Sequence, residues 1–201
     1  MSKNKRDINK STLITVLAMS IIAAIIIFSY YYIQTTTKPL FPNMSGDKSE
    51  AQILIEKDLE LAYPATPREV MRLFLRVTKC LYNDDLTEEE IESLVSKLRE
   101  INDEELLEIN TLENQIIILK EEIDEFKEEN KKLSNYSIEE SESIVYWTKD
   151  GRDYASVLVS STFTKSKELI KVYEDFTLRR DEDGKWKILG WSLSDNDSLD
   201  R

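Results

Sequence analysis

The pattern of hydrophobic and polar positions divides the chain into an uncharged apolar segment, a helical region and a region of strands. The apolar segment covers residues 13–33, 21 positions without one charged side chain. At roughly 1.5 Å per residue, a helix of this length spans about 31 Å, the thickness of the hydrocarbon core of a bilayer. The pattern therefore predicts a transmembrane helix over residues 13–33.

The charges beside this segment predict its orientation. The tail 1–12 carries four basic side chains against the single acid Asp7, whereas the fifteen residues after the segment carry only Lys38 and Lys48. Because positive charge favours the cytoplasmic side, we expect a single-pass protein of the plasma membrane with a cytoplasmic N-terminus and everything after the span outside. A cleaved signal peptide is the alternative. The segment is longer than the usual ~7–15 apolar residues and no small-x-small cleavage site follows it, which favours an uncleaved anchor.

Residues 34–48, which contain prolines and a glycine, are predicted to form a linker, and an outer domain follows over residues 49–194. Its first half has apolar residues at helical spacing, and Ser49 is placed to cap a short helix. Thr66 is a second N-cap, followed by a first-turn proline and the capping-box acid Glu69. These signals predict a helix over residues 67–82.

Two further helices are predicted before residue 133. Thr87 and Glu90 form another capping box ahead of an apolar stripe that begins at Ile91. A longer helical pattern starts at residue 103 or 111 and continues to residue 133. The helical part of the outer domain is therefore expected to cover residues 49–133.

The longer helix also fits a heptad pattern over residues 109–133, which is typical of a coiled coil. Its core positions are Ile109, Leu112, Ile116, Leu119, Ile123, Phe126, Asn130 and Leu133. Ile117 and Ile118 widen the apolar stripe beyond a two-residue seam, which favours packing within the domain. Self-association through residues 109–133 is the alternative.

Residues 136–194 are rich in β-branched and aromatic side chains, with polar breaks at short intervals. We expect four strands over residues 138–148, 154–164, 168–180 and 185–193. The connections between them are short, and short connections between neighbouring strands require antiparallel pairing. The sequence thus predicts an α+β domain in which helices pack on a curved four-stranded antiparallel sheet, followed by an acidic tail over residues 195–201.

Composition excludes several classes of protein. The chain has a net charge of −12, and because the first 33 residues carry +3, the remaining 168 carry −15. A domain this acidic is repelled by nucleic acid. There is no histidine, and the lone Cys80 lies in an apolar helical pattern that predicts burial. No Cys/His metal spacing and no phosphate-binding glycine loop is present, so we expect neither a metal nor a cofactor.

Two segments carry a family resemblance. One runs from residue 63 to residue 87 and includes Tyr63-Pro64-Ala65-Thr66-Pro67-Arg68-Glu69-Val70, and the other is residues 173–191. Together with the N-terminal apolar segment they resemble an uncharacterised family of small, N-terminally membrane-anchored proteins of Clostridia-type bacteria. This resemblance implies no activity and no catalytic residues.

The final two strands carry a second resemblance, at the level of the fold. They join through an Asp-Gly turn and end in Trp-x-Ile-x-Gly-Trp over residues 186–191. This segment is similar to the close of the nuclear transport factor 2-like (cystatin-like) α+β cone. The resemblance implies a bent sheet that often holds an apolar pocket against its helices.

Six residues are candidates for lining such a pocket: Glu174, Trp147, Tyr154, Tyr173, Trp186 and Trp191. The alternative is that the aromatic residues only fill the core of a small domain. Period-2 alternation places Glu174 on the apolar side of its strand with Phe176 and Leu178. An acid there would have a raised pKa and could act as a base, as carboxylates do in the isomerases that share the cone fold. A register error, a bulge or pairing with an arginine such as Arg152 would remove this role.

Arg68, Arg72 and Arg76 repeat every four residues and form a basic ridge on an acidic protein. The ridge could bind an acidic partner or a phosphate group. Alternatively, it is a solvated helix face or pairs with nearby acids such as Glu69.

Taken together, these patterns favour a binding protein over an enzyme. We expect a non-enzymatic, membrane-anchored extracytoplasmic binding or assembly module of the bacterial cell envelope, with an envelope protein as its partner. The alternative is a small-ligand receptor or an enzyme that uses a sheet–helix pocket with Glu174 as its acid or base.

Overall fold

The computed structural model describes residues 48–195 and 197–200. The predicted tail 1–12 and transmembrane segment 13–33 lie outside the described residues, as does the predicted linker apart from Lys48. Within the part that is described, no helix combines the length and the apolar character needed to cross a membrane.

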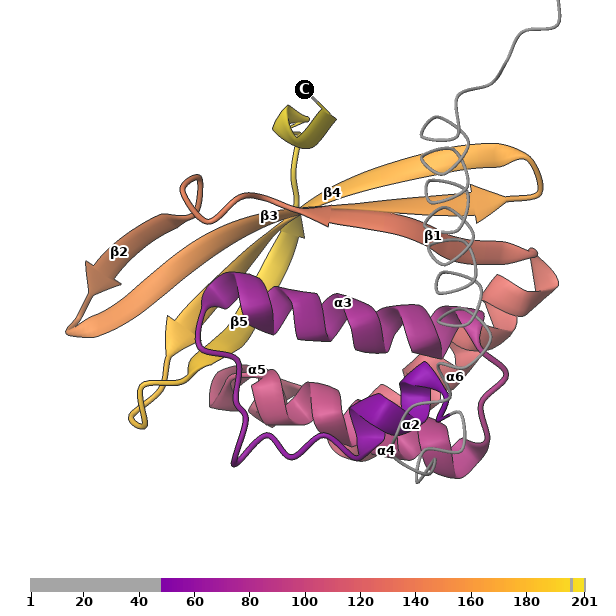
Figure 1. The fold of residues 1–201 in the computed structure, drawn as a ribbon, viewed down its shortest axis with the longest axis horizontal. Helices are drawn as coiled ribbons and strands as arrows, with labels where there is room; N and C mark the ends of the chain where they lie inside the picture. Colours follow the sequence, from indigo (N-terminus) through magenta and orange to yellow (C-terminus); the bar gives the residue numbers. More distant parts are fainter. Residues whose placement is uncertain (1–47, 196, 201) are drawn as a thin grey trace, which may run out of the picture. The chain divides into compact units, whose positions relative to one another are not determined.

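In the described residues helices come first and strands second, and the fold is α+β, as the sequence predicts (Figure 1). The helices are α2 (Glu50–Ile55), α3 (Pro67–Asn83), α4 (Glu88–Ile101), α5 (Glu104–Ile109) and α6 (Leu112–Glu128). The strands are β1 (Lys131–Ile138), β2 (Val145–Lys149), β3 (Arg152–Lys165), β4 (Glu168–Arg180) and β5 (Trp186–Leu193). A short 3₁₀ turn, η1 (Ser198–Asp200), lies in the predicted acidic tail.

The predicted caps start the helices, with one difference. Thr87 and Glu90 form a complete capping box at α4, because each side chain accepts the other residue's backbone N–H. At α3 the Thr66 hydroxyl accepts the N–H of Glu69 at 3.2 Å, but the Glu69 carboxylate accepts the N–H of Ala65 at 2.9 Å. The Glu69 carboxylate therefore accepts from the residue before the N-cap, whereas in a capping box it would accept from the N-cap Thr66 itself.

The long helix predicted up to residue 133 is interrupted and ends early. Thr111 caps a new helix after α5, and Asn130 adopts a positive φ of 49° just beyond the end of α6. Leu133 consequently lies in β1, where it is buried, while Ile109 at the end of α5 is exposed. The heptad spacing continues across these breaks, but no single helix carries it over residues 109–133.

The sheet is antiparallel and open, with the order β1-β3-β4-β5, and β2 pairs with β3 beside β1. The prediction of one strand over residues 138–148 is therefore wrong. The sheet has five strands, not the predicted four. β1 pairs with residues 159–165 and β2 with residues 152–156, so both occupy one edge of the long strand β3. Between them the chain leaves the ladder, and the Glu139 carboxylate accepts the N–H of Leu158 at 2.6 Å.

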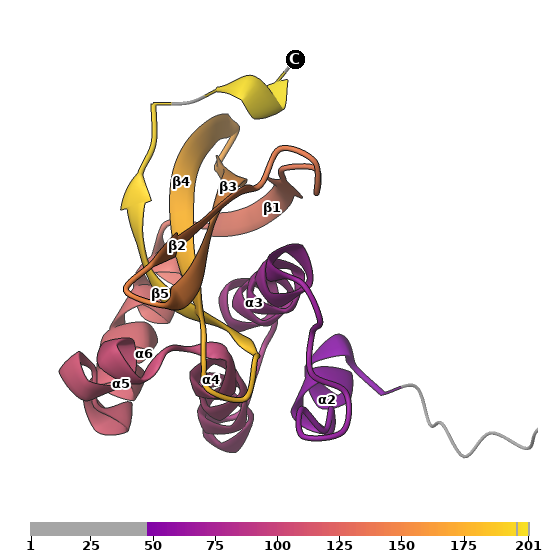
Figure 2. The same cartoon turned by 90° about the vertical axis from the view of Figure 1, so that its left-hand side faces the viewer.

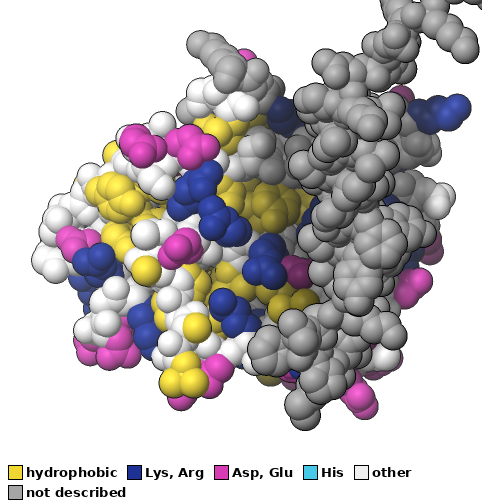
Figure 3. Space-filling view, in the orientation of Figure 1, with side chains coloured by type: hydrophobic (Ala, Val, Ile, Leu, Met, Phe, Trp, Pro, Cys, Tyr) yellow, Lys and Arg dark blue, Asp and Glu magenta, His cyan; other side chains and the backbone are white. Residues whose placement is uncertain are grey.

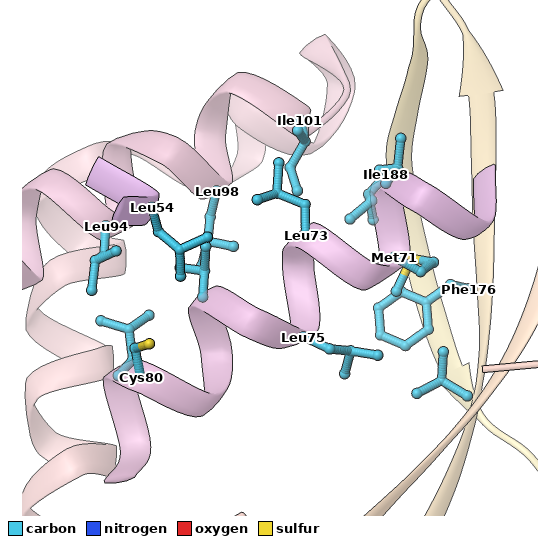
Figure 4. Close-up of a cluster of buried hydrophobic side chains, with 14 of the residues drawn as sticks. Leu54, Met71, Leu73, Leu75, Cys80, Leu94, Leu98, Ile101, Phe176 and Ile188 are labelled. Atoms are coloured by element: carbon cyan, nitrogen blue, oxygen red, sulfur yellow. The ribbon is translucent and has the colours of Figure 1, made fainter. Parts of the chain in front are cut away.

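Helix α3 lies directly against the sheet, and α4 and α2 lie beyond it (Figures 1 and 2). Figure 4 shows side chains leaving α3 in two directions, with Leu75 toward Phe176 of the sheet and Leu73 toward Ile101 of α4. Cys80 is one of these core residues and is buried, as predicted. Burial raises the pKa of the Cys80 thiol to about 12, which keeps it protonated and unreactive.

The connection between α4 and α5 wraps around the β5 edge of the sheet. Asn102 forms a parallel bridge with Ile188, and the N–H of Asp103 donates to the Ile188 carbonyl at 2.8 Å. The Asp103 carboxylate then binds both Nε and Nη2 of Arg179, whose Nη1 donates to Glu105 at 2.6 Å. Arg179 and Asp103 are 5% and 3% exposed. A buried, bidentate ion pair thus holds the start of α5 to Arg179 of β4.

We predict that Arg179→Met lowers the free energy of unfolding by roughly 3–5 kcal/mol, because Asp103 then remains buried without its countercharge. Adding Asp103→Leu should recover part of this loss, since the second change removes the unpaired charge. Urea unfolding followed by tryptophan fluorescence measures both effects, because all three tryptophans lie in the sheet. The exposed Lys167→Met is the control and should change stability by less than about 0.5 kcal/mol. A double variant no more stable than Arg179→Met would contradict the prediction.

Candidate functional site

The six residues predicted to line one pocket lie on both faces of the sheet. In antiparallel strands, directly paired residues project to the same face. Trp191 pairs with Phe176, which faces the helices, so Trp191 and Glu174 are on the helix-covered face. Trp186, which pairs with Arg180, is on that face too and is 4% exposed.

The other three candidates project from the opposite face. Trp147 pairs with Tyr154, and their rings stack with centroids 5.5 Å apart. Tyr154 pairs in turn with Arg179, and Tyr173 alternates to this same face. The structure therefore does not bring the six residues together. Alternation within β4 separates Tyr173 from Glu174, and the strand pairing of β2, β3 and β4 places Trp147 and Tyr154 on the side of Tyr173.

Glu174 occupies the position that alternation predicts, between Val159 of β3 and Leu193 of β5. Burial raises the pKa of its carboxyl group. Arg152 does not pair with it, since the Arg152 guanidinium lies 3.9 Å from Glu104 on the other face. Within residues 48–195 and 197–200, no hydrogen bond or ion pair compensates the Glu174 carboxylate.

A cavity of about 200 Å³ lies between α3, α4, α6 and β5. Glu174 does not line it, but projects to the same face of the sheet as the lining residue Trp191, which pairs with Phe176 two residues along β4. Its apolar and aromatic lining includes Phe74, Leu81, Tyr82, Leu119 and Trp191, and its one acid is Glu122. Phe74 and Trp191 both contact Phe176, with ring centroids 5.3 and 5.7 Å apart. The cavity is thus lined by three aromatic rings and one carboxylate.

Tyr82 connects the two acids of this site. Its hydroxyl donates to Oε2 of Glu122 at 2.8 Å, and its ring stacks on Phe126. Burial, the hydrogen bond to Glu122 and the charges of Glu122 and Glu174 all raise the pKa of the Tyr82 hydroxyl. The charge of Glu174 therefore acts on the Tyr82 hydroxyl, which lines the cavity.

A larger cleft, of about 440 Å³, lies on the opposite face around Arg179. Charged groups line it, and several of them pair with one another, as Arg179 does with Asp103 and Lys187 does with Asp181 at 3.9 Å. Burial lowers the pKa of Lys187, which also donates to the Glu100 carbonyl at 2.6 Å. In the described ranges no group of Asp, Glu, Cys or His side chains is arranged to hold a metal ion.

The predicted basic ridge is largely used inside the domain. Arg68 donates to the Glu139 carbonyl at 2.8 Å and pairs with Glu140, which holds the connection between β1 and β2. Arg76 pairs with Glu50 at 2.6 Å and fastens α2 to α3. Arg72 is exposed. In the view of Figure 3, Lys and Arg side chains lie among hydrophobic side chains near the middle of the domain.

Sequence analysis missed Phe74, Tyr82 and Glu122 as members of the site. Phe74 and Tyr82 stand eight residues apart on α3 and share one side of it, a spacing that the sequence showed only as part of the core stripe. Glu122 lies 40 residues from Tyr82, and no local pattern predicts their hydrogen bond.

The fold and the cavity define a class: an α+β protein whose helices cover one face of an open antiparallel sheet, with an aromatic cavity between the two layers. Residues 1–191 match the protein family described as "Domain of unknown function (DUF6715)", and the chain belongs to that family. This agrees with the expected membership of an uncharacterised family. No curated protein matches the sequence.

We predict that Glu174→Gln raises the free energy of unfolding at pH 7, because the folded state no longer holds a poorly solvated charge. Since the pKa of Glu174 is raised in the folded state, its ionisation costs stability as the pH rises above the ordinary pKa of glutamate. The advantage of the variant should therefore vanish below about pH 4, where the carboxyl group is protonated in both states. Urea midpoints at pH 4 and pH 7 measure this, with Glu168→Gln at the exposed start of β4 as control. A destabilised Glu174→Gln at pH 7 would contradict it.

Proposed function

We propose that this protein is a non-enzymatic, membrane-anchored binding module of the bacterial cell envelope. Residues 13–33 hold it in the plasma membrane with the N-terminus in the cytoplasm. The domain from residue 49 onward stands outside the cell and binds an envelope protein. Its net negative charge makes nucleic acid an unfavourable partner.

The observation that carries the proposal is the exposed apolar rim of the aromatic cavity. Trp191 and Ile118 line the cavity and are each 53% exposed, and Leu193 beside Glu174 is 80% exposed. A cluster of exposed apolar side chains on a charged domain favours a binding surface. Tryptophan in particular is enriched among the residues that contribute most to protein–protein affinity.

The finer features of the fold and family form part of this proposal. The sheet twists strongly and its helices cover one face, which supports the cone of the nuclear transport factor 2-like (cystatin-like) proteins (Figures 1 and 2). The resemblance of residues 63–87 and 173–191 supports a place among the membrane-anchored proteins of Clostridia-type bacteria. In the cone the space between sheet and helices often holds a ligand pocket, and the cavity at Trp191 has this position.

A second candidate function is a small-ligand receptor or enzyme with Glu174 as acid or base. The observation that favours it is the raised pKa of Glu174 next to a cavity. A general base needs its acid partner and a substrate within hydrogen-bonding reach. Among the described residues Glu122 and Tyr82 are the titratable groups that line the cavity, but they already bond to each other. We therefore place binding ahead of catalysis.

Cross-linking in intact cells, followed by capture of the full-length protein and mass spectrometry, tests the proposed function. We expect a reproducible envelope protein whose yield falls at least tenfold when Trp191 is replaced by Ser, because this ring forms the exposed rim. Leu169→Ser, a change at a still more exposed apolar residue elsewhere in the sheet, should leave the yield unchanged. A partner captured equally by both variants would place binding elsewhere. Cross-linked dimers of this chain alone would favour self-association through α6, where Ile117 and Ile118 are exposed.

A further inference from the structure

We propose that the cavity between α3, α6 and β5 binds an organic cation, an ammonium or guanidinium group on a short apolar stem. The occupant we infer is a lysine or arginine side chain of the protein partner. This inference deepens the proposed function, because it rests on the same cavity and states which chemistry the cavity recognises.

The first observation is the combination of aromatic faces and acceptors. Phe74, Tyr82 and Trp191 line the cavity, and the faces of aromatic rings attract cations. Glu122 lines it as well, and Glu174 projects from β4 to the same face of the sheet as Trp191. A neutral apolar group would gain from the rings but would offer no countercharge to the Glu122 carboxylate. A cation with an apolar stem satisfies the rings and the carboxylates together.

The second observation is that no countercharge from the described residues already fills this role. The Glu174 carboxylate has no ion pair there, and Glu122 accepts only from the neutral Tyr82 hydroxyl. No lysine or arginine of the described chain lines the cavity. Arg99 donates through Nη1 to two residues that line the cavity, to the Asn110 carbonyl at 2.7 Å and to Gln115 at 3.0 Å, so its guanidinium is already hydrogen-bonded. An anion would meet the Glu122 carboxylate inside the cavity.

Size and surroundings favour a side chain over a larger free ligand. A cavity of about 200 Å³ is close to the ~150 Å³ that is sufficient for a benzene molecule, so it accommodates one side chain of the size of arginine. The exposed Ile118 and Leu193 extend the apolar surface past the cavity. A partner segment would cover them, whereas a small amine would leave them in water. The overall negative charge of the domain also favours approach of a basic segment.

Isosteric probes test the charge requirement on the full-length protein in non-ionic detergent. n-Butylguanidinium and n-butylurea have nearly the same shape and differ in charge. We expect saturable binding of butylguanidinium, followed by calorimetry or by the fluorescence of Trp191, at least tenfold tighter than that of butylurea. Equal binding of the two, or binding of neither, would overturn the inference.

Two short peptides test the source of the cation. Acetyl-Leu-Arg-Leu-amide should compete with butylguanidinium and bind at least tenfold tighter than it, because the flanking leucines cover Ile118 and Leu193. The same peptide with citrulline in place of arginine has no charge and should bind at least tenfold more weakly than the arginine peptide. An arginine peptide no tighter than butylguanidinium would overturn the assignment to a partner segment.

Variants locate the site. Glu174→Gln and Glu122→Gln should each weaken butylguanidinium binding about three- to tenfold, and the double variant more. Glu121→Gln, an exposed change on the same helix, should leave it unchanged. Urea midpoints show that each variant is folded. Retained affinity in the double variant would overturn the inference.

The capture experiment separates this inference from the proposed function. If the double glutamine variant loses the partner together with Trp191→Ser, the inference and the proposed function are both supported. If Trp191→Ser loses the partner but the double glutamine variant keeps it, the cationic ligand is wrong while the binding module stands. If both variants keep the partner, the cavity is not the binding site.

Discussion

The buried ion pair between Arg179 and Asp103 fixes the connection between α4 and α5 to the sheet. Two charges removed from water cost free energy, and bidentate geometry with a third bond to Glu105 offsets that cost. The pair follows directly on the bridge between Asn102 and Ile188, so the same segment also covers part of the β5 edge. From α5 the chain returns through α6, which packs against α4 and α3.

The return of α6 creates the aromatic cavity. Its residue Glu122 bonds Tyr82 of α3, and Trp191 of β5 closes the third side. The three elements are distant in sequence and are positioned by different interactions. The hydrophobic core positions α3, and the ladder with β4 positions β5. Helix α6 is positioned by its contacts with α3 and α4. A cavity at such a junction is not filled by any one element, which explains why half-exposed apolar groups and a poorly solvated carboxylate can coexist there.

The charges on the two faces of the sheet are used differently. On the face of Arg179 the opposite charges lie close enough to pair, and this makes the larger cleft a structural feature in our interpretation. On the helix-covered face Glu174 has no such partner among the described residues. Arginines that read as a ridge in the sequence instead fasten loops, since Arg68 holds the connection after β1 and Arg76 holds α2. Glu174, and not the basic ridge, is therefore the charged group that remains available to bind a ligand.

The sequence by itself determined the elements that depend on local physics. Capping residues and helical spacing placed α3 and α4, and alternation placed β4 at its observed bounds and Glu174 on its observed face. Where interactions are long-range, the sequence was insufficient. It merged β1 and β2, because their separation depends on pairing with one edge of β3, and it extended the last helix into Leu133, because only strand pairing ends it. Strand pairing decided which aromatic residues of different strands share a face. Tertiary structure alone decided that Arg179 meets Asp103 and that Glu122 and Tyr82 join Trp191, since these contacts link residues 40 or more positions apart.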